Sequence, residues 1–185
     1  MSDGEIRLRP AAEEDLEAVV ALVNASYRGE GGWTNETAFL QGPRTRGEDL
    51  RRDLADSPSA VILIAEGDPS RSEEALQGVV RLQPLGGEIW ELGMLAIPPA
   101  LQDRGLGRSL LAAAERFIRG RGGRYIEITV LNIRRPLIAW YQRRGYRETG
   151  EVRPFPYESS LFGAPTRDDL AFVVMRKVCD HEDAD

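Results

Sequence analysis

The sequence predicts a single α/β (α+β) domain that is built on a sheet of mixed direction. Three apolar, strand-like segments follow one another at residues 60–66, 77–83 and 88–97. After them, helical and strand-like patterns alternate up to the last strand, and this order is typical of an α/β or α+β sheet. The chain of 185 residues has the length of one domain. A domain of that size buries about 70% of its unfolded surface, so it needs no disulfide or metal to fold.

The elements expected before residue 100 follow from the spacing of the apolar side chains. Alternation of apolar and polar residues indicates a strand, and apolar residues three and four apart indicate a helix. In order, we predict a strand that stops at Pro10, a helix at 13–25, an irregular segment at 27–47 with a short helix at 36–40, a helix at 48–55, and the three strands already named.

The second half of the chain contains the clearest helical pattern. Leu106, Leu110, Ala114 and Phe117 lie on one face of a helix, and Gly120 ends it. The elements expected around and after this helix are a helix at 106–119, a strand at 125–131, a helix at 136–144 with proline in its first turn, and two final strands at 146–151 and 170–178.

Composition excludes several classes of protein. The longest apolar run, residues 60–65, is far shorter than the roughly 20 residues that span a bilayer, and the polar N-terminus does not have the pattern of a signal peptide. One cysteine and one histidine leave no pair for an internal disulfide or a Cys/His zinc site. We therefore expect a reduced, cytoplasmic protein without a metal or a membrane anchor, with flexible tails at 1–4 and 180–185.

Charge is distributed unevenly along the chain. The formal net charge of −6 argues against nucleic-acid binding. Residues 101–150 nevertheless carry a net charge of +7, whereas 1–100 carry −9 and 151–185 carry −4. A basic central segment in an acidic chain favours an anionic ligand at that segment. The alternative is that these arginines lie on solvated helix faces, which would give the same net charge.

The segment between the third strand and the 106–119 helix carries the most information. It reads Gln102-Asp103-Arg104-Gly105-Leu106-Gly107-Arg108. The N-terminus of a helix presents unpaired N–H groups and partial positive charge to a phosphate, and glycines let the backbone approach it closely. A P-loop is excluded because no Lys-Ser/Thr pair follows the second glycine, and a dinucleotide fingerprint is excluded because Leu110 replaces its third glycine. A plain tight turn before a helix remains the simpler alternative.

The order of the motifs narrows this choice. The strand at 91–98, the Q-x-x-G-x-G turn, the helix, the strand at 125–131 and the segment from Trp140 to Tyr146 together resemble the GNAT superfamily of acyl-CoA-dependent N-acetyltransferases. The resemblance covers about residues 5–178, which we take as the domain. It implies a central mixed, mostly antiparallel, twisted sheet of about six or seven strands flanked by about four helices.

The resemblance also implies site residues. The turn would hold the coenzyme A pyrophosphate, the strand before it would pair with the pantetheine arm, and a tyrosine would protonate the departing thiolate. Carried onto this sequence, these roles fall on Gln102, Gly105 and Gly107 with the neighbouring Arg104, Leu106 and Arg108, then on Leu95, Ala96 and Ile97, and then on Tyr141. Tyr141 could equally pack in the core beside Trp140. The family often has an asparagine seven residues before this tyrosine, but here Asn132 precedes it by nine.

Acetyl transfer to an amine has chemical requirements that can be checked against the sequence. A free amine has a pKa of about 10, so a base must take its proton, directly or through water. Alternation puts Glu91 on the same strand face as Gly93, Leu95 and Ile97. A carboxylate among apolar side chains is a candidate general base. A salt bridge to Arg81 on a neighbouring strand is the alternative.

The acceptor is less well defined by the sequence. Arg28, Trp33, Arg44 and Tyr157 lie in loops that would cover an acceptor. The arginines suit a carboxylate-bearing amine, whereas the acidic remainder of the chain suits a polyamine or aminoglycoside, so the choice stays open. Acetyl-CoA is the expected co-substrate, a small-molecule or peptide amine the expected acceptor, and a homodimer is compatible with the resemblance. A non-catalytic coenzyme A sensor on the same fold is the alternative function.

Overall fold

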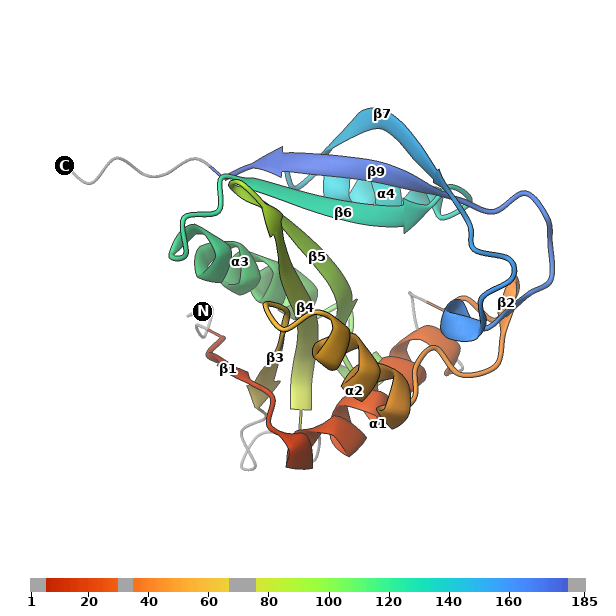
Figure 1. Cartoon of the computed structure of the whole chain (residues 1–185), viewed down its shortest axis with the longest axis horizontal. Helices are drawn as coiled ribbons and strands as arrows, with labels where there is room; N and C mark the ends of the chain where they lie inside the picture. Colours follow the sequence, from red (N-terminus) through yellow and green to blue (C-terminus); the bar gives the residue numbers. More distant parts are fainter. Residues whose placement is uncertain (1–5, 30–34, 67–75, 180–185) are drawn as a thin grey trace.

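A seven-stranded sheet in the order β1-β3-β4-β5-β6-β9-β7 runs through the centre of the molecule (Figure 1). The computed structural model describes residues 6–29, 35–66 and 76–179. The strands of the sheet are β1 (Leu8–Pro10), β3 (Val61–Glu66), β4 (Leu76–Gly86), β5 (Ile89–Ala96), β6 (Tyr125–Leu131), β7 (Arg147–Pro154) and β9 (Ala171–Val178). The α-helices are α1 (Leu16–Arg28), α2 (Gly47–Asp56), α3 (Leu106–Arg119) and α4 (Arg135–Gln142).

The pairing of the strands confirms a mixed and mostly antiparallel sheet. Only β5 and β6 run parallel, and all other neighbours in the sheet are antiparallel. The parallel ladder joins Ile89–Glu91 to residues 125–127 and then ends. Beyond this point β5 and β6 diverge, and the sheet opens into two arms (Figure 1). The edge of β5 after Glu91 is therefore available for other partners.

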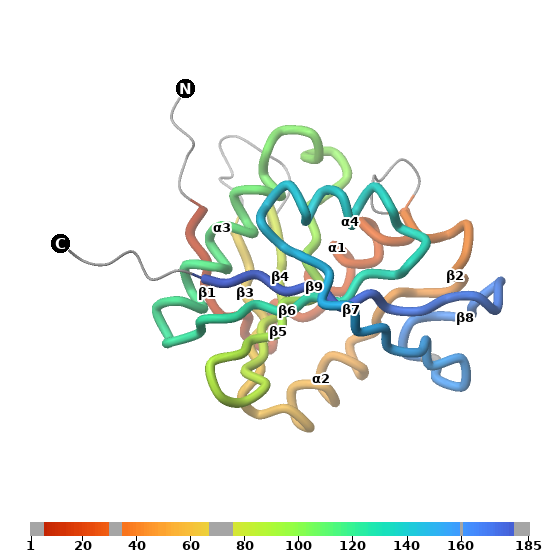
Figure 2. Tube along the Cα trace, turned by 90° about the horizontal axis from the view of Figure 1, so that it is seen from above, coloured from red at the N-terminus to blue at the C-terminus, as the bar shows by residue number. Residues whose placement is uncertain are grey.

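Helices cover both faces of the sheet. One core cluster joins α1 and α2 to a sheet face that includes Ile64 and Val79, and a second joins α3 and α4 to the opposite face, which includes Val80 and Leu82. Seen from above, α2 and α4 lie on opposite sides of β6 and β9 (Figure 2). Burying apolar surface on both faces is the main favourable term in such a layered fold.

A small additional lobe lies beside the open end of the sheet. Here β2 (Leu40–Gln41) pairs with β8 (Ala164–Pro165), and the turn η3 (Ser160–Phe162) precedes β8. A third cluster fills the space between this lobe and the sheet, and it is made of Leu40, Leu131, Phe155 and Leu170 with Phe39, Ile133, Phe162 and Phe172 packed against them. Segments that are more than 100 residues apart in sequence thus enclose the end of β6.

Most predicted elements are confirmed and several boundaries change. The helix at 106–119 and the strand at 125–131 have the predicted ends. The predicted helix at 13–25 is a turn of 3-10 helix, η1 (Glu13–Asp15), followed by α1, which continues to Arg28. The short helix at 36–40 is wrong, because Leu40 N–H donates to Glu36 O in a single turn that leads directly into β2. The β2–β8 ribbon was not predicted from the sequence.

Candidate active site

A bulge in β5 determines which side chains face which side of the sheet. Arg81 pairs with Gly93, but Val79 pairs with Ala96, so β5 carries one extra residue between them. Met94 lies in this bulge with a φ of 50°, a left-handed conformation that a side chain adopts only under local constraint. As a result Leu95 packs against the α3 cluster, whereas Ala96 packs with α1.

The loop after β5 is fixed by hydrogen bonds to the carbonyl of Ile97. Ser26 Oγ donates to this oxygen at 2.8 Å and Gln102 Nε2 donates to it at 3.2 Å. A short turn, η2 (Pro99–Leu101), follows, and Gly105 then adopts a φ of 81° to start α3. Glycine tolerates this conformation because it has no Cβ.

The first turn of α3 presents backbone donors to the space beside it. Within the described part of the chain, the N–H groups of Leu106 and Gly107 have no acceptor, as expected at the start of a helix. A Cβ at Gly107 would lie 3.7 Å from Trp140 Cζ2 and 4.0 Å from Ile97 Cγ1. A side chain larger than alanine at this position would therefore enter the space between α3 and α4.

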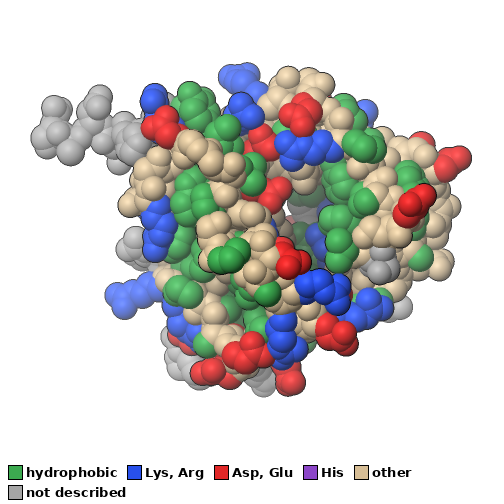
Figure 3. Space-filling model, viewed as in Figure 1, with side chains coloured by type: hydrophobic (Ala, Val, Ile, Leu, Met, Phe, Trp, Pro, Cys, Tyr) green, Lys and Arg blue, Asp and Glu red, His purple; other side chains and the backbone are tan. Residues whose placement is uncertain are grey.

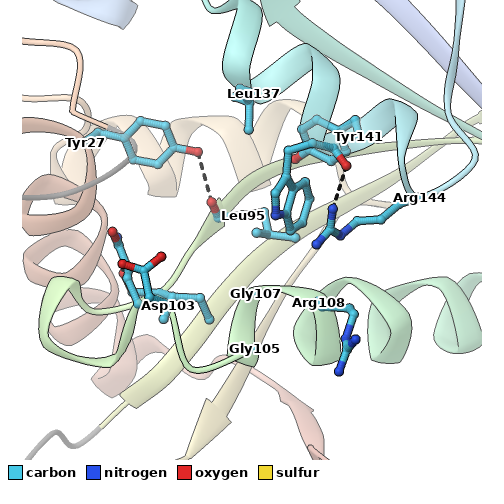
Figure 4. A pocket seen from close by; sticks show the side chains of 12 residues that line it. Tyr27, Leu95, Asp103, Gly105, Gly107, Arg108, Leu137, Tyr141 and Arg144 are labelled. Carbon is cyan, nitrogen blue, oxygen red and sulfur yellow. Dashed lines mark hydrogen bonds between the residues drawn. The ribbon is translucent and has the colours of Figure 1, made fainter.

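That space is a cavity of about 260 Å³, which we call the donor cavity (Figure 4). Gly105 and Gly107 form one wall, and Leu137, Tyr141 and Arg144 face them from α4 and the residues after it (Figure 4). The lining residues are Tyr27, Leu95, Ile97, Gln102, Asp103, Gly105, Gly107, Arg108, Leu137, Trp140, Tyr141 and Arg144. Backbone donors and arginines at one end of an otherwise largely apolar cavity suit an elongated molecule with a phosphate group.

Arg144 contributes positive charge to the donor cavity. Its guanidinium stacks on the Trp140 ring at 3.5 Å from the centroid and donates to the Trp140 carbonyl at 2.6 Å. Its buried Nε has no hydrogen-bond partner in the structure. Burial, followed by the neighbouring charges of Arg143 and Arg108, lowers the pKa of this guanidinium. An anion bound here would offset both the unpaired donor and the repulsion between the arginines.

A second cavity, of about 110 Å³, adjoins the first, and we call it the acceptor cavity. Its walls are mostly apolar and aromatic, and its polar lining side chains include Glu36, Arg44 and Arg134. The space-filling view shows the molecule hollowed between the two arms of the sheet, with hydrophobic side chains along one wall and Arg or Lys atoms inside (Figure 3).

The two cavities meet at four residues that line both of them: Tyr27, Leu95, Leu137 and Tyr141. Tyr27 donates its hydroxyl to Leu95 O at 3.1 Å, and Tyr141 lies across the cavity from Tyr27 (Figure 4). The Tyr141 side chain comes from α4 and is only 7% exposed. A phenol at the junction of two cavities is placed to exchange a proton with groups from either side.

A family model for the acetyltransferase (GNAT) family matches residues 32–146. This match spans more than half of the chain. The chain belongs to the GNAT acetyltransferase family. The search of curated proteins found no match.

Solved structures share the fold of this acetyltransferase at low sequence identity. A ribosomal-protein-S18-alanine N-acetyltransferase from Escherichia coli is 16% identical with a TM-score of 0.65, covering 97% of this chain and 98% of that one. A ribosomal-protein-alanine N-acetyltransferase from Brucella melitensis is 22% identical with a TM-score of 0.63, covering 94% and 99%. A spermidine N-acetyltransferase chimera from Vibrio cholerae and hSSAT is 16% identical with a TM-score of 0.66, covering 95% and 96%. These enzymes are named for different acceptors, so the shared fold does not identify the acceptor.

The residues predicted to bind the donor in this acetyltransferase divide into two groups. Those that line the donor cavity are Leu95, Ile97, Gln102, Gly105, Gly107 and Arg108. Ala96 is buried on the opposite face, Leu106 packs into the α3 cluster, and the Arg104 side chain is exposed. Arg104 and Leu106 were predicted to bind the pyrophosphate through their backbone N–H groups. The positions of their side chains therefore do not test that prediction.

Glu91 does not share a sheet face with all of the residues that simple alternation predicted. It shares a face with Gly93, as expected, but the bulge at Met94 turns Leu95 and Ile97 to the other side, so that part of the prediction is wrong. Glu91 forms the alternative salt bridge, with its Oε2 3.5 Å from Arg81 Nη1. Gly93, two residues further on, lines the acceptor cavity.

The residues predicted to bind the acceptor have different positions. Arg44 lines the acceptor cavity. Arg28 is only 10% exposed and holds structure together, because it binds Glu36 at 2.7 Å and donates to Gly42 O and Phe162 O at 2.8 Å. Tyr157 lines neither cavity, and its hydroxyl accepts from Leu170 N–H at 2.6 Å. Trp33 lies outside the described residues.

Sequence reasoning missed several lining residues. Glu36 and Arg134 are far apart in sequence and meet only in the fold, with Arg134 Nη1 2.9 Å from Glu36 Oε1. Asp103 lines the donor cavity, although its type gives no reason to expect it beside a phosphate. Asn132, in contrast, has a structural role, because it bonds to Asp169 O and to Ala171 N–H. Arg144 could have been found from the sequence, because it lies inside the Tyr-x-x-x-Gly segment that contributes to the family resemblance.

The structure limits two further expectations. No helix among the described residues is long and apolar enough to cross a membrane. Within the same residues, no group of three or more His, Cys, Asp and Glu side chains is arranged to hold a metal ion.

Buried phenols predict how stability changes at alkaline pH. Burial is the main cause that raises the pKa of Tyr141 and of Tyr146. In the unfolded chain these phenols ionise near their ordinary pKa of about 10, so above that pH the unfolded state binds fewer protons than the folded one. We expect this contribution to the free energy of unfolding to be complete below about pH 10 and to be lost as pH rises further.

Urea unfolding at several pH values tests this prediction. In a Tyr146→Phe variant the free energy of unfolding should decline less steeply above about pH 10. An unchanged slope in that variant would contradict the prediction.

Proposed function

We propose that the chain transfers an acetyl group from acetyl-CoA to a primary amine by direct attack in a ternary complex. The observation that carries this proposal is the junction of the two cavities, where Tyr27, Leu95, Leu137 and Tyr141 line both. A donor bound in one cavity and an amine bound in the other would meet there without a covalent enzyme intermediate. We propose residues 5–178 as the domain that carries this activity.

The start of α3 is suited to hold the donor. The N–H groups of Leu106 and Gly107, with Arg108 and Arg144 beside them, would bind the pyrophosphate of acetyl-CoA. The edge of β5 after Glu91 has no strand partner on the β6 side. Leu95, Ala96 and Ile97 would offer main-chain groups on this edge to the pantetheine arm. Both contacts would orient the thioester toward the junction of the cavities.

The transfer itself requires two proton movements. The amine nitrogen forms a bond to the thioester carbonyl carbon while the carbon–sulfur bond breaks. Tyr141 would give its phenolic proton to the departing sulfur, because a phenol whose pKa is raised above the ordinary value of about 10 carries its proton at neutral pH. Glu91 would take the proton from the amine through water, since it shares a face with Gly93 of the acceptor cavity. A main-chain N–H near Leu95 would polarise the carbonyl.

Release of free thiol from acetyl-CoA in the presence of amines tests the proposal. The panel includes amino acids, polyamines, aminoglycosides and peptides with a free N-terminus. We expect steady release with at least one class and a matching acetylated product by mass spectrometry. Thermal stabilisation by coenzyme A without any thiol release would instead support the alternative function, a non-catalytic acyl-CoA sensor. Cytoplasmic location and a homodimer remain predictions.

The role of Glu91 has its own test. Glu91→Gln is expected to lower kcat by about 100-fold, the lower end of the range for a lost acid–base group, and to leave the Kd for acetyl-CoA unchanged. Glu88→Gln is the matched control, because Glu88 is half-exposed and pairs with Arg124 at 3.5 Å. A Glu91→Gln enzyme with a kcat near the wild-type value would leave Glu91 only its salt bridge to Arg81.

A further inference from the structure

The acceptor cavity contains an arginine that no described carboxylate neutralises. The Arg44 guanidinium lies between two aromatic rings, 5.4 Å from the centroid of Tyr27 and 4.9 Å from that of Phe162. Within the described parts of the chain, Arg44 has no salt bridge. Aromatic faces hold a guanidinium in place and leave its N–H edge for a planar anion.

The backbone around Arg44 is held firmly. Asn24 Oδ1 accepts from Arg44 N–H at 2.7 Å and from Thr45 N–H at 3.2 Å, while Asn24 Nδ2 donates to Thr45 O at 2.9 Å. Asn24 belongs to α1, which packs directly on the sheet. Arg44 is therefore positioned before a ligand arrives, and this reduces the entropy that binding must overcome.

The charges around the acceptor cavity do not balance. Glu36 is 5% exposed and lies between Arg28 at 2.7 Å and Arg134 at 2.9 Å. The charged side chains that line the cavity are Arg44, Arg134 and Glu36, so two positive charges face one negative charge, a net of +1. The whole chain, in contrast, carries −6. A wholly cationic acceptor would thus be attracted to the surface and repelled by the cavity.

The dimensions of the site limit the acceptor's length. Tyr27 spans the distance between the charge and the reaction centre, because Arg44 lies over its ring and its hydroxyl reaches Leu95 O. Arg44 and the junction of the cavities therefore lie beside the same tyrosine side chain, so a bound anion and a bound amine would belong to one short acceptor. The remaining walls include Leu40, Phe155 and Phe172, which suit a compact apolar group.

From these observations we infer that the acceptor carries a carboxylate close to its primary amine, as an α-amino acid or a similarly short amino acid does, and that Arg44 binds this carboxylate. The apolar walls favour an aliphatic or aromatic side chain. This inference rests on the proposed function, because it names the substrate class of the same site. It resolves the two acceptor classes left open by the sequence in favour of the carboxylate.

The test compares amines that differ mainly in the carboxylate. Thiol release from acetyl-CoA is measured with leucine, with leucinamide and with 3-methylbutylamine, which share the side chain, and with spermidine as a polycation. A charge-assisted, bidentate pair contributes about 1.5–3 kcal/mol, which corresponds to a factor of about 10 to 100. We expect kcat/KM for leucine to exceed that for leucinamide and for 3-methylbutylamine by this factor, with spermidine slowest.

Variants assign the preference to Arg44. Arg44→Gln is expected to lower kcat/KM for leucine by about 10- to 100-fold and so to bring it close to the kcat/KM for 3-methylbutylamine, while Arg44→Lys retains part of the preference. Arg46→Gln is the matched control, because Arg46 is exposed and lies outside both cavities. The affinity for acetyl-CoA should be the same in all these proteins, and thermal melting shows that each of them is folded.

The outcomes separate this inference from the proposed function. Thiol release that favours 3-methylbutylamine or spermidine, or a leucine preference that survives in Arg44→Gln, overturns the carboxylate assignment and leaves the acetyltransferase intact. Absence of thiol release with every amine, although acetyl-CoA binds, overturns the proposed function and this inference with it.

Discussion

Replacing Tyr141 by phenylalanine is expected to lower kcat by about 100- to 10 000-fold, the range for loss of a general acid, while acetyl-CoA still binds. The substitution removes one oxygen and leaves the ring in place. Tyr141 packs edge-on against Trp140 and Tyr146, with ring centroids 4.9 Å and 5.3 Å away. Phenylalanine preserves both contacts, so the donor cavity keeps its shape.

The environment of Tyr141 keeps the phenol in its protonated form. Burial is the main cause that raises its pKa, followed by the nearby Tyr27, and the positive charges of Arg134 and Arg144 oppose the shift. The phenol is therefore protonated throughout the neutral range, and the same arginines would stabilise the phenolate formed when the proton leaves. The kcat of the wild-type enzyme should not fall through ionisation of Tyr141 below about pH 10.

Tyr146→Phe is the matched control for this prediction. Tyr146 is also buried, and its hydroxyl donates to Glu115 at 3.0 Å, but it lines neither cavity. The control should lower stability and leave kcat near the wild-type value. Steady-state kinetics and calorimetric titration with acetyl-CoA distinguish the two variants. Unchanged turnover in Tyr141→Phe would reduce Tyr141 to a packing residue, the alternative that the sequence left open.

Regular patterns in the sequence were enough to predict most of the fold. The α3 helix has apolar side chains at strict helical spacing and a glycine just after its end, and both of its predicted ends are confirmed. The predicted strand at 125–131 is also confirmed. Its sequence is mostly apolar, and most of its side chains are buried. Where a local pattern is strong and tertiary contacts agree with it, the sequence alone specifies the element.

The errors occur where one residue breaks a regular pattern. The bulge at Met94 shifts all side chains after it to the opposite face. Gly93 directly before it is the one local signal in the strand, because an isolated glycine inside a strand often marks a bulge. The prediction of a helix at 36–40 failed for a different reason. Glu36 is held by Arg28 and Arg134, and the chain continues from there into β2 instead of forming a helix. In both cases long-range contacts override local preference.

The two halves of the site differ in the same way. The donor cavity is formed largely by one continuous segment, from Leu95 to Arg108, so a local motif predicts much of it. The acceptor cavity draws on α1, the loops around Glu36 and Arg44, β6, and the segment around Phe162. Such residues come together only through the tertiary fold, so the sequence provided acceptor candidates without indicating which of them line the cavity.

Gly107→Leu is expected to weaken acetyl-CoA binding more than about 100-fold, because the side chain would displace the phosphate from its donors. Two charge-assisted hydrogen bonds contribute about 1.5–3 kcal/mol each, and losing both corresponds to at least that factor in Kd. A Cβ at this position fits, with its nearest neighbour, Trp140 Cζ2, at 3.7 Å. The branched end of leucine would then extend into the donor cavity.

Gly93→Leu is a matched variant for the other cavity. Gly93 lines the acceptor cavity, and a Cβ placed on it would meet nothing within 4 Å. The same substitution at this position should leave the Kd for acetyl-CoA near the wild-type value and raise KM for the amine. Each variant adds the same side chain to a glycine, so differences in general stability are small compared with the effect on one ligand.

Calorimetric titration with acetyl-CoA and steady-state kinetics in which the amine concentration is varied therefore give opposite results for the two leucine variants if the cavities have the roles proposed. Gly107→Ala completes the series, because a single methyl group leaves most of the cavity open and should retain binding. A folded Gly107→Leu protein with wild-type affinity for acetyl-CoA would mean that the pyrophosphate binds elsewhere. Because the start of α3 combines unpaired backbone donors with the positive end of a helix beside the donor cavity, that result would remove the physical basis for assigning this cavity to the donor.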